Sequence, residues 1–163
     1  MSQSMNSTTQ TYEVRLQING EAHDLQLDPQ RTLLDVLRTD LQMVGTKCAC
    51  NQGVCGACSV LIDGEAKRSC LHLAVAMGDR DIVTIEGLEQ DGALDPVQQA
   101  FIDEGAIQCG FCMPAMAIAA KTLLAENPNP TADEVRHGLG GNLCRCSGYV
   151  KVIDAVLSLS GGK

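Results

Sequence analysis

Aromatic side chains and cationic charge are both scarce in this chain of 163 residues. It has two Tyr, two Phe and no Trp, so any core must be built from aliphatic side chains and Met. Lys and Arg total 12 against 20 Asp and Glu, a net charge of -8 that argues against a nucleic-acid-binding surface, because phosphate binding needs clustered cations. No apolar run approaches the roughly 18 residues that a membrane span requires. The composition therefore predicts neither a nucleic-acid nor a membrane partner.

Several functional motifs are also missing. The polar start of the chain lacks the charged region and apolar run of a secretory signal, and it lacks the Arg pair of a twin-arginine signal, so we expect a cytoplasmic location. No G-x-G-x-x-G or Walker pattern offers a flavin or nucleotide site, and no nucleophile motif or paired acid and base is present. We therefore expect no catalytic residue in this chain.

The first half of the sequence has the pattern of a small sheet domain. Apolar and polar residues alternate from Tyr12 to Leu27 around a turn at Asn19-Gly20, which predicts a β-hairpin. The other expected elements are a helix over 32–41 that ends at Gly45, a hairpin around Asp63-Gly64 and a strand over 81–85. This half is therefore predicted to be α+β.

From about Glu89 the pattern becomes helical. The expected helix starts are Pro96 with Asp95 as N-cap, Pro114, the capping box at Thr131 and Tyr149. The apolar helix from Pro114 to Leu124 suits either a bundle core or a subunit interface. We predict a polar, disordered tail over 1–11, a sheet domain over 12–88 and an all-helical domain over 89–163.

Cysteine, in contrast, is abundant, with nine in the chain. In a reducing cytosol an odd set of cysteines indicates metal binding rather than disulfides. Cys50, Cys55 and Cys58 have the C-x4-C-x2-C spacing of plant-type ferredoxins, with Cys70 available as a distant fourth ligand. Three sulfurs in so short a loop require sharp backbone bends, which explains the glycines between them.

A second set of cysteines lies in the helical half: Cys109, Cys112, Cys144 and Cys146. Each pair precedes a predicted helix, whose N-terminal dipole favours thiolates and an anionic cluster. From spacing alone, four thiolates suit either a zinc ion or a two-iron, two-sulfur (2Fe-2S) cluster.

Three further residues could be taken for functional ones. Cys48 is left over, and using it in place of Cys50 would lengthen the spacing to C-x6-C, so we expect it to bind no metal. Arg145 lies between two ligands and either balances cluster charge or is simply exposed. His23 is expected to face solvent from a strand and to have no function.

Two long motifs resemble the iron-sulfur subunit of the xanthine oxidase family of molybdenum hydroxylases. The first comprises Gly45-Thr46-Lys47, Cys50, Gly53, Cys55-Gly56-Ala57-Cys58-Ser59-Val60 and Ser69-Cys70. The second comprises Gln108-Cys109-Gly110-Phe111-Cys112, Pro114-Ala115-Met116, Asn127-Pro128 and Gly141-Asn142-Leu143-Cys144-Arg145-Cys146-Ser147-Gly148-Tyr149. Together they extend over nearly the whole chain.

The resemblance implies a ferredoxin-like β-grasp domain and a four-helix-bundle domain, each with one 2Fe-2S cluster. It implies a large partner subunit with molybdopterin and a medium partner with FAD, in a heterotrimer or its dimer, between which this chain relays electrons. Gln108 and Cys146 are then the positions expected to approach the pterin, while the β-grasp cluster lies nearer the flavin. The substrate is expected to be an N-heteroaromatic or an aldehyde. The alternatives are a structural zinc-binding interaction module and a free-standing ferredoxin.

Overall fold

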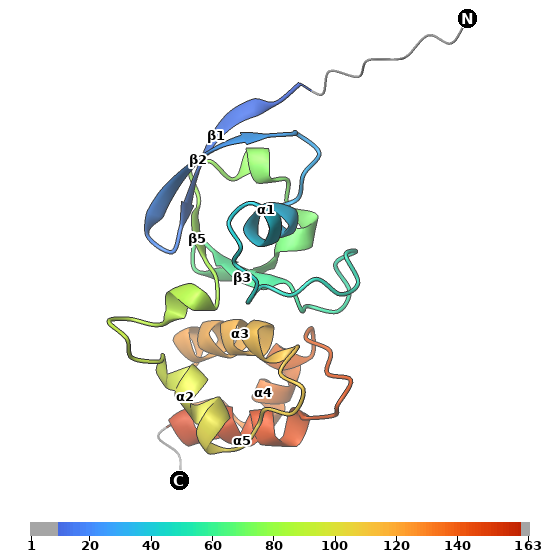
Figure 1. Ribbon diagram of the computed structural model, residues 1–163. Coiled ribbons are helices and arrows are strands. Elements are labelled where there is room, and N and C mark those ends of the chain that lie inside the picture. Colours follow the sequence, from blue (N-terminus) through green and yellow to red (C-terminus); the bar gives the residue numbers. More distant parts are fainter. Residues whose placement is uncertain (1–9, 161–163) are drawn as a thin grey trace, which may run out of the picture.

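The computed structural model describes residues 10–160, which form a sheet half above a helical half (Figure 1). The α+β expectation is confirmed, with the helices of the second half following all the strands of the first. Most of the predicted tail, residues 1–9, lies outside the described residues. The domain boundary between residues 88 and 89 stays a prediction.

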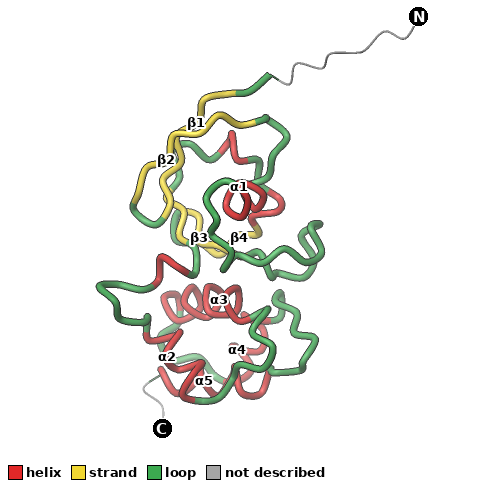
Figure 2. The backbone as a smooth tube through the Cα atoms, in the orientation of Figure 1, coloured by secondary structure: helices red, strands yellow, loops and turns green. Residues whose placement is uncertain are grey.

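The sheet half is a five-stranded sheet with one helix, α1, packed against it (Figure 2). Its elements are β1 (Tyr12–Ile18), β2 (Glu21–Leu27), α1 (Leu33–Thr39), β3 (Ser59–Ile62), β4 (Glu65–Arg68) and β5 (Asp81–Val83). The strand order is β2-β1-β5-β3-β4, and β1 pairs parallel with β5 while the other pairs are antiparallel. The core between sheet and helix is aliphatic, as the shortage of aromatics predicts, and includes Leu16, Ile18, Leu37 and Ile82.

Helix α1 is shorter than the sequence predicts. It ends at Thr39 rather than near Leu41, and Gln42 rather than Gly45 has a left-handed backbone, with φ of 57°. Gly45 has a different reason to be glycine: a Cβ there would lie 2.4 Å from the Ile85 side chain. The glycine thus permits a close approach between two loops instead of ending the helix.

The expectation that His23 faces solvent is wrong. His23 lies opposite Leu16 in the β1–β2 ladder, and paired residues of an antiparallel ladder point to the same face of the sheet. Leu16 is fully buried, so this is the core face. His23 is half-buried, and its Nε2 atom is buried without a hydrogen-bond partner among residues 10–160.

The second half consists of α2 (Pro96–Asp103), α3 (Met113–Glu126), α4 (Ala132–Leu139) and α5 (Tyr149–Leu159). The predicted caps are confirmed, since Asp95 and Thr131 both form capping boxes. The bundle core includes Phe101, the one aromatic residue that is buried within residues 10–160. No helix in that range is long and apolar enough to cross a bilayer.

Helix α3 has two buried faces, which explains why its sequence is apolar nearly all round. Met116 packs in the bundle core, while Ile118 packs against Leu61 and Leu88 of the sheet half. Figure 2 shows α3 as the upper layer of the bundle, directly under β3 and β4. The helix therefore serves as bundle core and also joins the two halves within one chain.

Candidate functional site

The first set of cysteines lies at the lower end of the sheet half. Cys50, Cys55 and Cys58 lie in the long loop between α1 and β3, and Cys70 lies in the short 3-10 turn that follows β4. Their thiols lie next to each other in two pairs, Cys50 with Cys55 and Cys58 with Cys70. The structure thus brings together the four residues that the spacing selects.

Backbone N–H groups and burial act on these thiols in opposite ways. The N–H groups of Cys55 and Gln52 point at the Cys50 sulfur and lower the pKa of Cys50 to about 6. The Cys55 nitrogen is 3.4 Å from that sulfur. Burial raises the pKa of Cys70 to about 11. The loop therefore already directs donors at a sulfur, an arrangement that also stabilises a sulfur-ligated cluster.

The glycines of the first loop have the sharp bends that the sequence predicts. Gly53 and Gly56 have φ of 76° and 73°, in the left-handed region that side chains other than glycine rarely adopt. Gly56 also touches the helical half, because a Cβ on it would lie 2.4 Å from the Gly141 carbonyl oxygen. A side chain there would push the two halves apart.

The second set lies in the two loops that precede α3 and α5. Cys109 and Cys112 lie between α2 and α3, with Cys112 as the N-cap of α3. Cys144 and Cys146 lie in the loop that leads into α5. Their thiols also lie in contact two by two, Cys109 with Cys146 and Cys112 with Cys144. Each pair thus joins the two loops.

Each of these pairs holds one thiol that ionises easily and one that does not. The N–H of Phe111 lowers the pKa of Cys109, and the hydrogen bond to Cys109 raises the pKa of Cys146. In the other pair, burial raises the pKa of Cys112 to about 12. Burial also opposes ionisation of Cys144, but N–H groups led by that of Gly148, 3.4 Å from the sulfur, outweigh it and lower the pKa of Cys144.

This donor set fits a 2Fe-2S cluster better than a single zinc ion. Zinc requires four ligands around one point, whereas a two-iron cluster takes two ligands on each iron. In each set the four thiols are arranged as two pairs, and all of them are free of disulfides.

The two sets of cysteines face each other across the junction of the halves. A cavity of about 510 Å³ is lined by Cys55 of the first set and by Cys109, Cys112 and Cys144 of the second. The N–H of Leu143 donates to the carbonyl of Cys55 at 2.9 Å. A single hydrogen bond therefore connects the neighbour of a cysteine in the second set to the backbone of a cysteine in the first.

Two residues at this junction were given no role by the sequence. Arg68 donates to the Gly141 carbonyl at 3.0 Å, and Asn142 donates to the Gly56 carbonyl at 3.1 Å. Neither contact has a local sequence signal, because the partners are 73 and 86 residues apart. Asn142 lies within the second motif quoted above and Arg68 directly precedes Ser69-Cys70 of the first, but neither motif indicates what these side chains contact.

The remaining candidate residues lie at the edges of the site. Cys48 is exposed and belongs to neither pair of the first set. Gln108 is exposed beside the loop that carries Cys146, since its Nε2 is 3.9 Å from where a Cβ on Gly148 would lie. Arg145 is exposed between two cysteines, and no carboxylate within residues 10–160 forms an ion pair with it.

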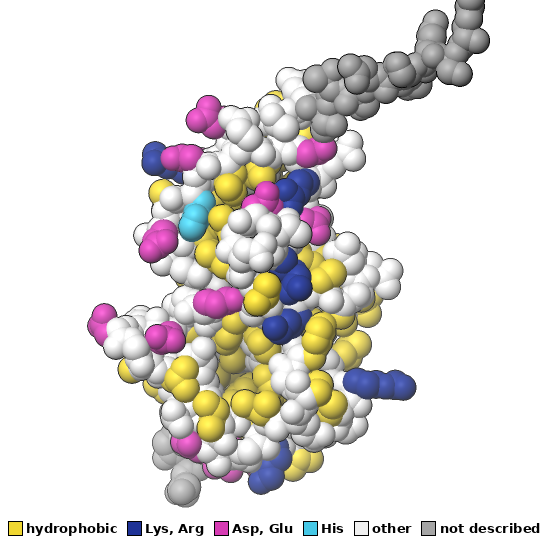
Figure 3. All heavy atoms as spheres, viewed as in Figure 1, with side chains coloured by type: hydrophobic (Ala, Val, Ile, Leu, Met, Phe, Trp, Pro, Cys, Tyr) yellow, Lys and Arg dark blue, Asp and Glu magenta, His cyan; other side chains and the backbone are white. Residues whose placement is uncertain are grey.

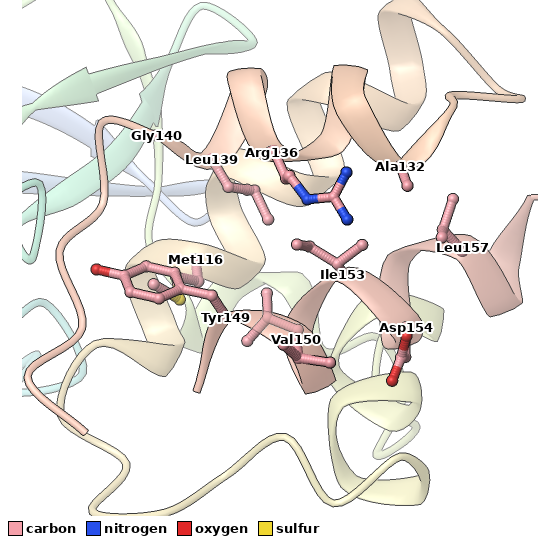
Figure 4. Close-up of a pocket in the computed structure, with 11 residues that line it drawn as sticks. Met116, Ala132, Arg136, Leu139, Gly140, Tyr149, Val150, Ile153, Asp154 and Leu157 are labelled. Atoms are coloured by element: carbon pink, nitrogen blue, oxygen red, sulfur yellow. The ribbon is translucent and has the colours of Figure 1, made fainter. Parts of the chain in front are cut away.

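A separate apolar cavity of about 470 Å³ lies between α4 and α5 (Figure 4). Figure 4 shows Ile153 of α5 beneath Arg136 of α4, Leu157 near Ala132 at one end and the Tyr149 ring at the other. No cysteine lines it. We therefore place the chemistry of the chain at the junction cavity and not here.

Comparisons with known proteins divide the chain into the same two halves. Residues 16–82 match the family described as "2Fe-2S iron-sulfur cluster binding domain", and residues 84–157 match the family described as "[2Fe-2S] binding domain". The nicotine 6-hydroxylase small subunit of Paenarthrobacter nicotinovorans is 46% identical over 155 residues, which cover 95% of this chain and 93% of that protein. The nicotinate dehydrogenase small FeS subunit of Eubacterium barkeri is 43% identical over 143 residues, 88% and 91% of the two chains.

Solved structures show the same fold. Quinoline 2-oxidoreductase from Pseudomonas putida 86 contains a chain that superposes with a TM-score of 0.89 at 45% identity, covering 93% of each chain. Aldehyde oxidoreductase from Desulfovibrio gigas superposes with a TM-score of 0.85 at 39% identity, over 91% of this chain but 17% of that one. The chain belongs to the small iron-sulfur subunits of xanthine oxidase family molybdenum hydroxylases, which transfer electrons within multi-subunit oxidoreductases.

Proposed function

We propose that this chain passes electrons from a molybdopterin centre in a large partner subunit to FAD in a medium partner subunit. Cys50, Cys55, Cys58 and Cys70 hold one 2Fe-2S cluster, and Cys109, Cys112, Cys144 and Cys146 hold the other. When bound, each cluster accepts and gives up single electrons. The chain itself binds no substrate.

The observation that carries this proposal is the direct connection between the two cysteine sets. Cys55 and Cys144 line one cavity, and Leu143, the neighbour of Cys144, donates its N–H to the Cys55 carbonyl at 2.9 Å. Covalent bonds and one short hydrogen bond thus join a residue of one set to a residue of the other. Such a connection suits a relay, whereas two independent structural metal sites would not need it.

The charges around the cysteines support the same function. Most Lys and Arg side chains within residues 10–160 pair with a carboxylate, whereas Arg38, Lys47, Arg68 and Arg145 do not. All of them lie close to the cysteine sets in the chain or bond to the segments that carry them, since Arg38 donates to the Thr46 carbonyl at 2.8 Å. We infer that these cations offset the negative charge of thiolate-bound clusters in an otherwise acidic protein.

Exposed apolar side chains support docking to partner subunits. Figure 3 shows hydrophobic side chains gathered over the helical half on one face of the molecule. Around the second cysteine set, Ile107, Phe111, Leu143 and Val150 are between 44% and 70% exposed. We propose that the molybdopterin subunit covers this region, where Gln108 and Cys146 approach the pterin, and that the FAD subunit covers the first set.

The complex that we propose is a cytoplasmic heterotrimer, or its dimer, that oxidises an N-heteroaromatic compound. The nicotine 6-hydroxylase, nicotinate dehydrogenase and quinoline 2-oxidoreductase subunits are 43% to 46% identical to this chain. The subunits named for 6-hydroxypseudooxynicotine and caffeine are 40% identical, and aldehyde oxidoreductases are 38% to 39% identical. An aldehyde is the second candidate substrate. The nine free cysteines favour a reducing compartment.

The test is low-temperature EPR of the complex purified through a tag on this chain and reduced with dithionite, together with an iron count. Two distinct signals at about four irons per chain are expected for two four-thiolate sites. Cys55→Ser should remove one signal and Cys112→Ser the other. A colourless complex that contains zinc and gives no signal would overturn the proposal. Purification of the loaded chain without partners would leave the free-standing ferredoxin as the better reading.

A further inference from the structure

Three consecutive residues of the helical half bond to the sheet half. The Gly141 carbonyl accepts from Arg68 at 3.0 Å, the Asn142 side chain donates to Gly56 at 3.1 Å, and the Leu143 N–H donates to Cys55 at 2.9 Å. We call these three hydrogen bonds the cross-domain clamp. Because each bond lies within three residues of a cysteine on both sides, the clamp joins the two cysteine sets rather than the domains in general.

Arg68 makes the only charged contact of the clamp. A hydrogen bond from a guanidinium to a carbonyl is stronger than one between neutral groups. The side chain is half-buried, its Nε is buried without a partner within residues 10–160, and no carboxylate in that range pairs with it. The Gly141 carbonyl is therefore the acceptor that holds this guanidinium at the junction.

The atoms around the cross-domain clamp are closely packed. A Cβ on Gly141 would lie 2.9 Å from Nη2 of Arg68, and a Cβ on Gly56 would lie 2.4 Å from the Gly141 oxygen. The loop carrying Cys144 is thus pressed between Arg68 and the first cysteine loop. A change at Arg68 should move this segment, and the second set of cysteines with it.

We propose that Arg68 is a positioning residue that fixes the distance between the two clusters and so the rate of electron transfer between them. The inference rests on the proposed function, because it requires both cysteine sets to hold clusters. Electron tunnelling falls exponentially with distance, so even a small displacement of the Cys144 loop slows it. The contact acts through geometry, and it is therefore visible in the magnetic interaction between the clusters as well as in the rate.

The experiment uses the complete complex and measures two quantities in each variant. One is the spin-spin splitting between the two reduced clusters by EPR, and the other is the rate of electron transfer between them after flash reduction. Arg68→Met removes the donor and the charge and keeps an unbranched apolar stem, whereas Arg68→Lys keeps a donor and the charge. Gly141→Ala displaces the guanidinium without removing its charge. Arg80→Met is the matched control, since Arg80 is an arginine of the same domain that pairs with Asp63 instead.

We expect a smaller splitting and a several-fold slower transfer in Arg68→Met and in Gly141→Ala, and wild-type values in Arg80→Met. Arg68→Lys should retain much of the wild-type splitting and transfer rate. The double variant should be no worse than either single one, because both substitutions break the same contact. Since Gly141→Ala keeps the charge, its effect separates displacement of the loop from a change of cluster potential.

Wild-type splitting and rate in Arg68→Met and Gly141→Ala, each with about four irons and two signals, would overturn the inference. If Arg68→Met loses iron, Gly141→Ala decides in its place: a smaller splitting and slower transfer there support the inference, and wild-type values overturn it. Fewer than two signals in the wild-type complex would instead overturn the proposed function. The two failures are therefore distinguishable.

Discussion

Replacing Gly56 with Ala tests the close approach of the two cysteine-bearing loops. Gly56 has φ of 73°, and an added Cβ would lie 2.4 Å from the Gly141 oxygen and 3.1 Å from the Asn142 Cα. Both of these atoms belong to the backbone, so they cannot swing away as the end of a flexible side chain can. Gly64, at φ of 82°, would meet nothing within 4 Å and is the matched control.

Both substitutions place a side chain on a left-handed backbone, but only Gly56→Ala also forces a methyl group into a packed contact. A left-handed backbone costs a residue with a Cβ about 1–2 kcal/mol, and both variants lose this amount. Forcing an extra methyl group into a packed contact costs about 1–3 kcal/mol more, and only Gly56→Ala incurs it. We therefore expect Gly56→Ala to be less stable than Gly64→Ala by about 2 kcal/mol, which for a chain of this size lowers Tm by about 4–8 °C.

The assay is thermal unfolding of the loaded protein at one fixed scan rate, followed by loss of the visible absorbance of the clusters. Iron content before heating shows whether each variant starts with both sites filled. A Tm for Gly56→Ala equal to that of Gly64→Ala would refute the argument. It would mean that the two loops separate freely and that the contact contributes nothing to stability.

Further predictions concern the spare cysteine, one N-cap and one thiolate. Cys48→Ser should keep both EPR signals, because Cys48 is exposed and outside the thiol pairs, while Cys50→Ser should remove one; the reverse result would show that the ligands are misassigned. Asp95→Ala should lower the free energy of unfolding by about 2 kcal/mol, since Asp95 caps α2 and its carboxylate is 8% exposed in an ion pair. Asp133→Ala removes an exposed ion pair and should change the free energy of unfolding by about 0.5 kcal/mol or less. Equal losses of stability for Asp95→Ala and Asp133→Ala in a denaturant titration would contradict this reasoning. In the iron-free chain, alkylation of Cys50 by iodoacetamide should rise with pH through about 6 and then level off, because its lowered pKa makes the thiolate dominant above that pH. Cys70, with a pKa of about 11, should be alkylated slowly at neutral pH. Equal alkylation of Cys50 and Cys70, detected by mass spectrometry, would contradict this.

Local patterns in the sequence predicted the elements and the cysteine sets well. Asn19-Gly20 forms its hairpin turn with both residues at positive φ, and Asp95 and Thr131 cap the helices that they precede. The spacing of the cysteines selected two sets of four, and in the structure each set comes together in pairs. All of these features depend on residues close together in the chain or on a chemical type that is easily recognised.

Features that depend on distant partners were missed or misread. His23 is a different case: it has the parity of Leu25 and Leu27, so the alternation already places it on the core face, and expecting it to face solvent misread that pattern. Gly45 resembles a helix terminator, but its neighbour in space is Ile85. Arg68 and Asn142 have no local signal, since their partners come from the other half of the chain. Periodicity and spacing carry no information about such contacts.

The burial of both faces of α3 restricts how this chain can be divided or recombined. The two family-sized units meet near residues 82–84, where a genetic cut would seem natural. Such a cut would leave Leu88 and Ile118 on the C-terminal fragment and Leu61 on the N-terminal one, and each fragment would expose apolar side chains that are buried in the whole chain. A chimera that joins this sheet half to the helical half of a relative must therefore match side-chain shapes across that seam. The two halves match two separate families, but they can be exchanged between relatives only as one unit.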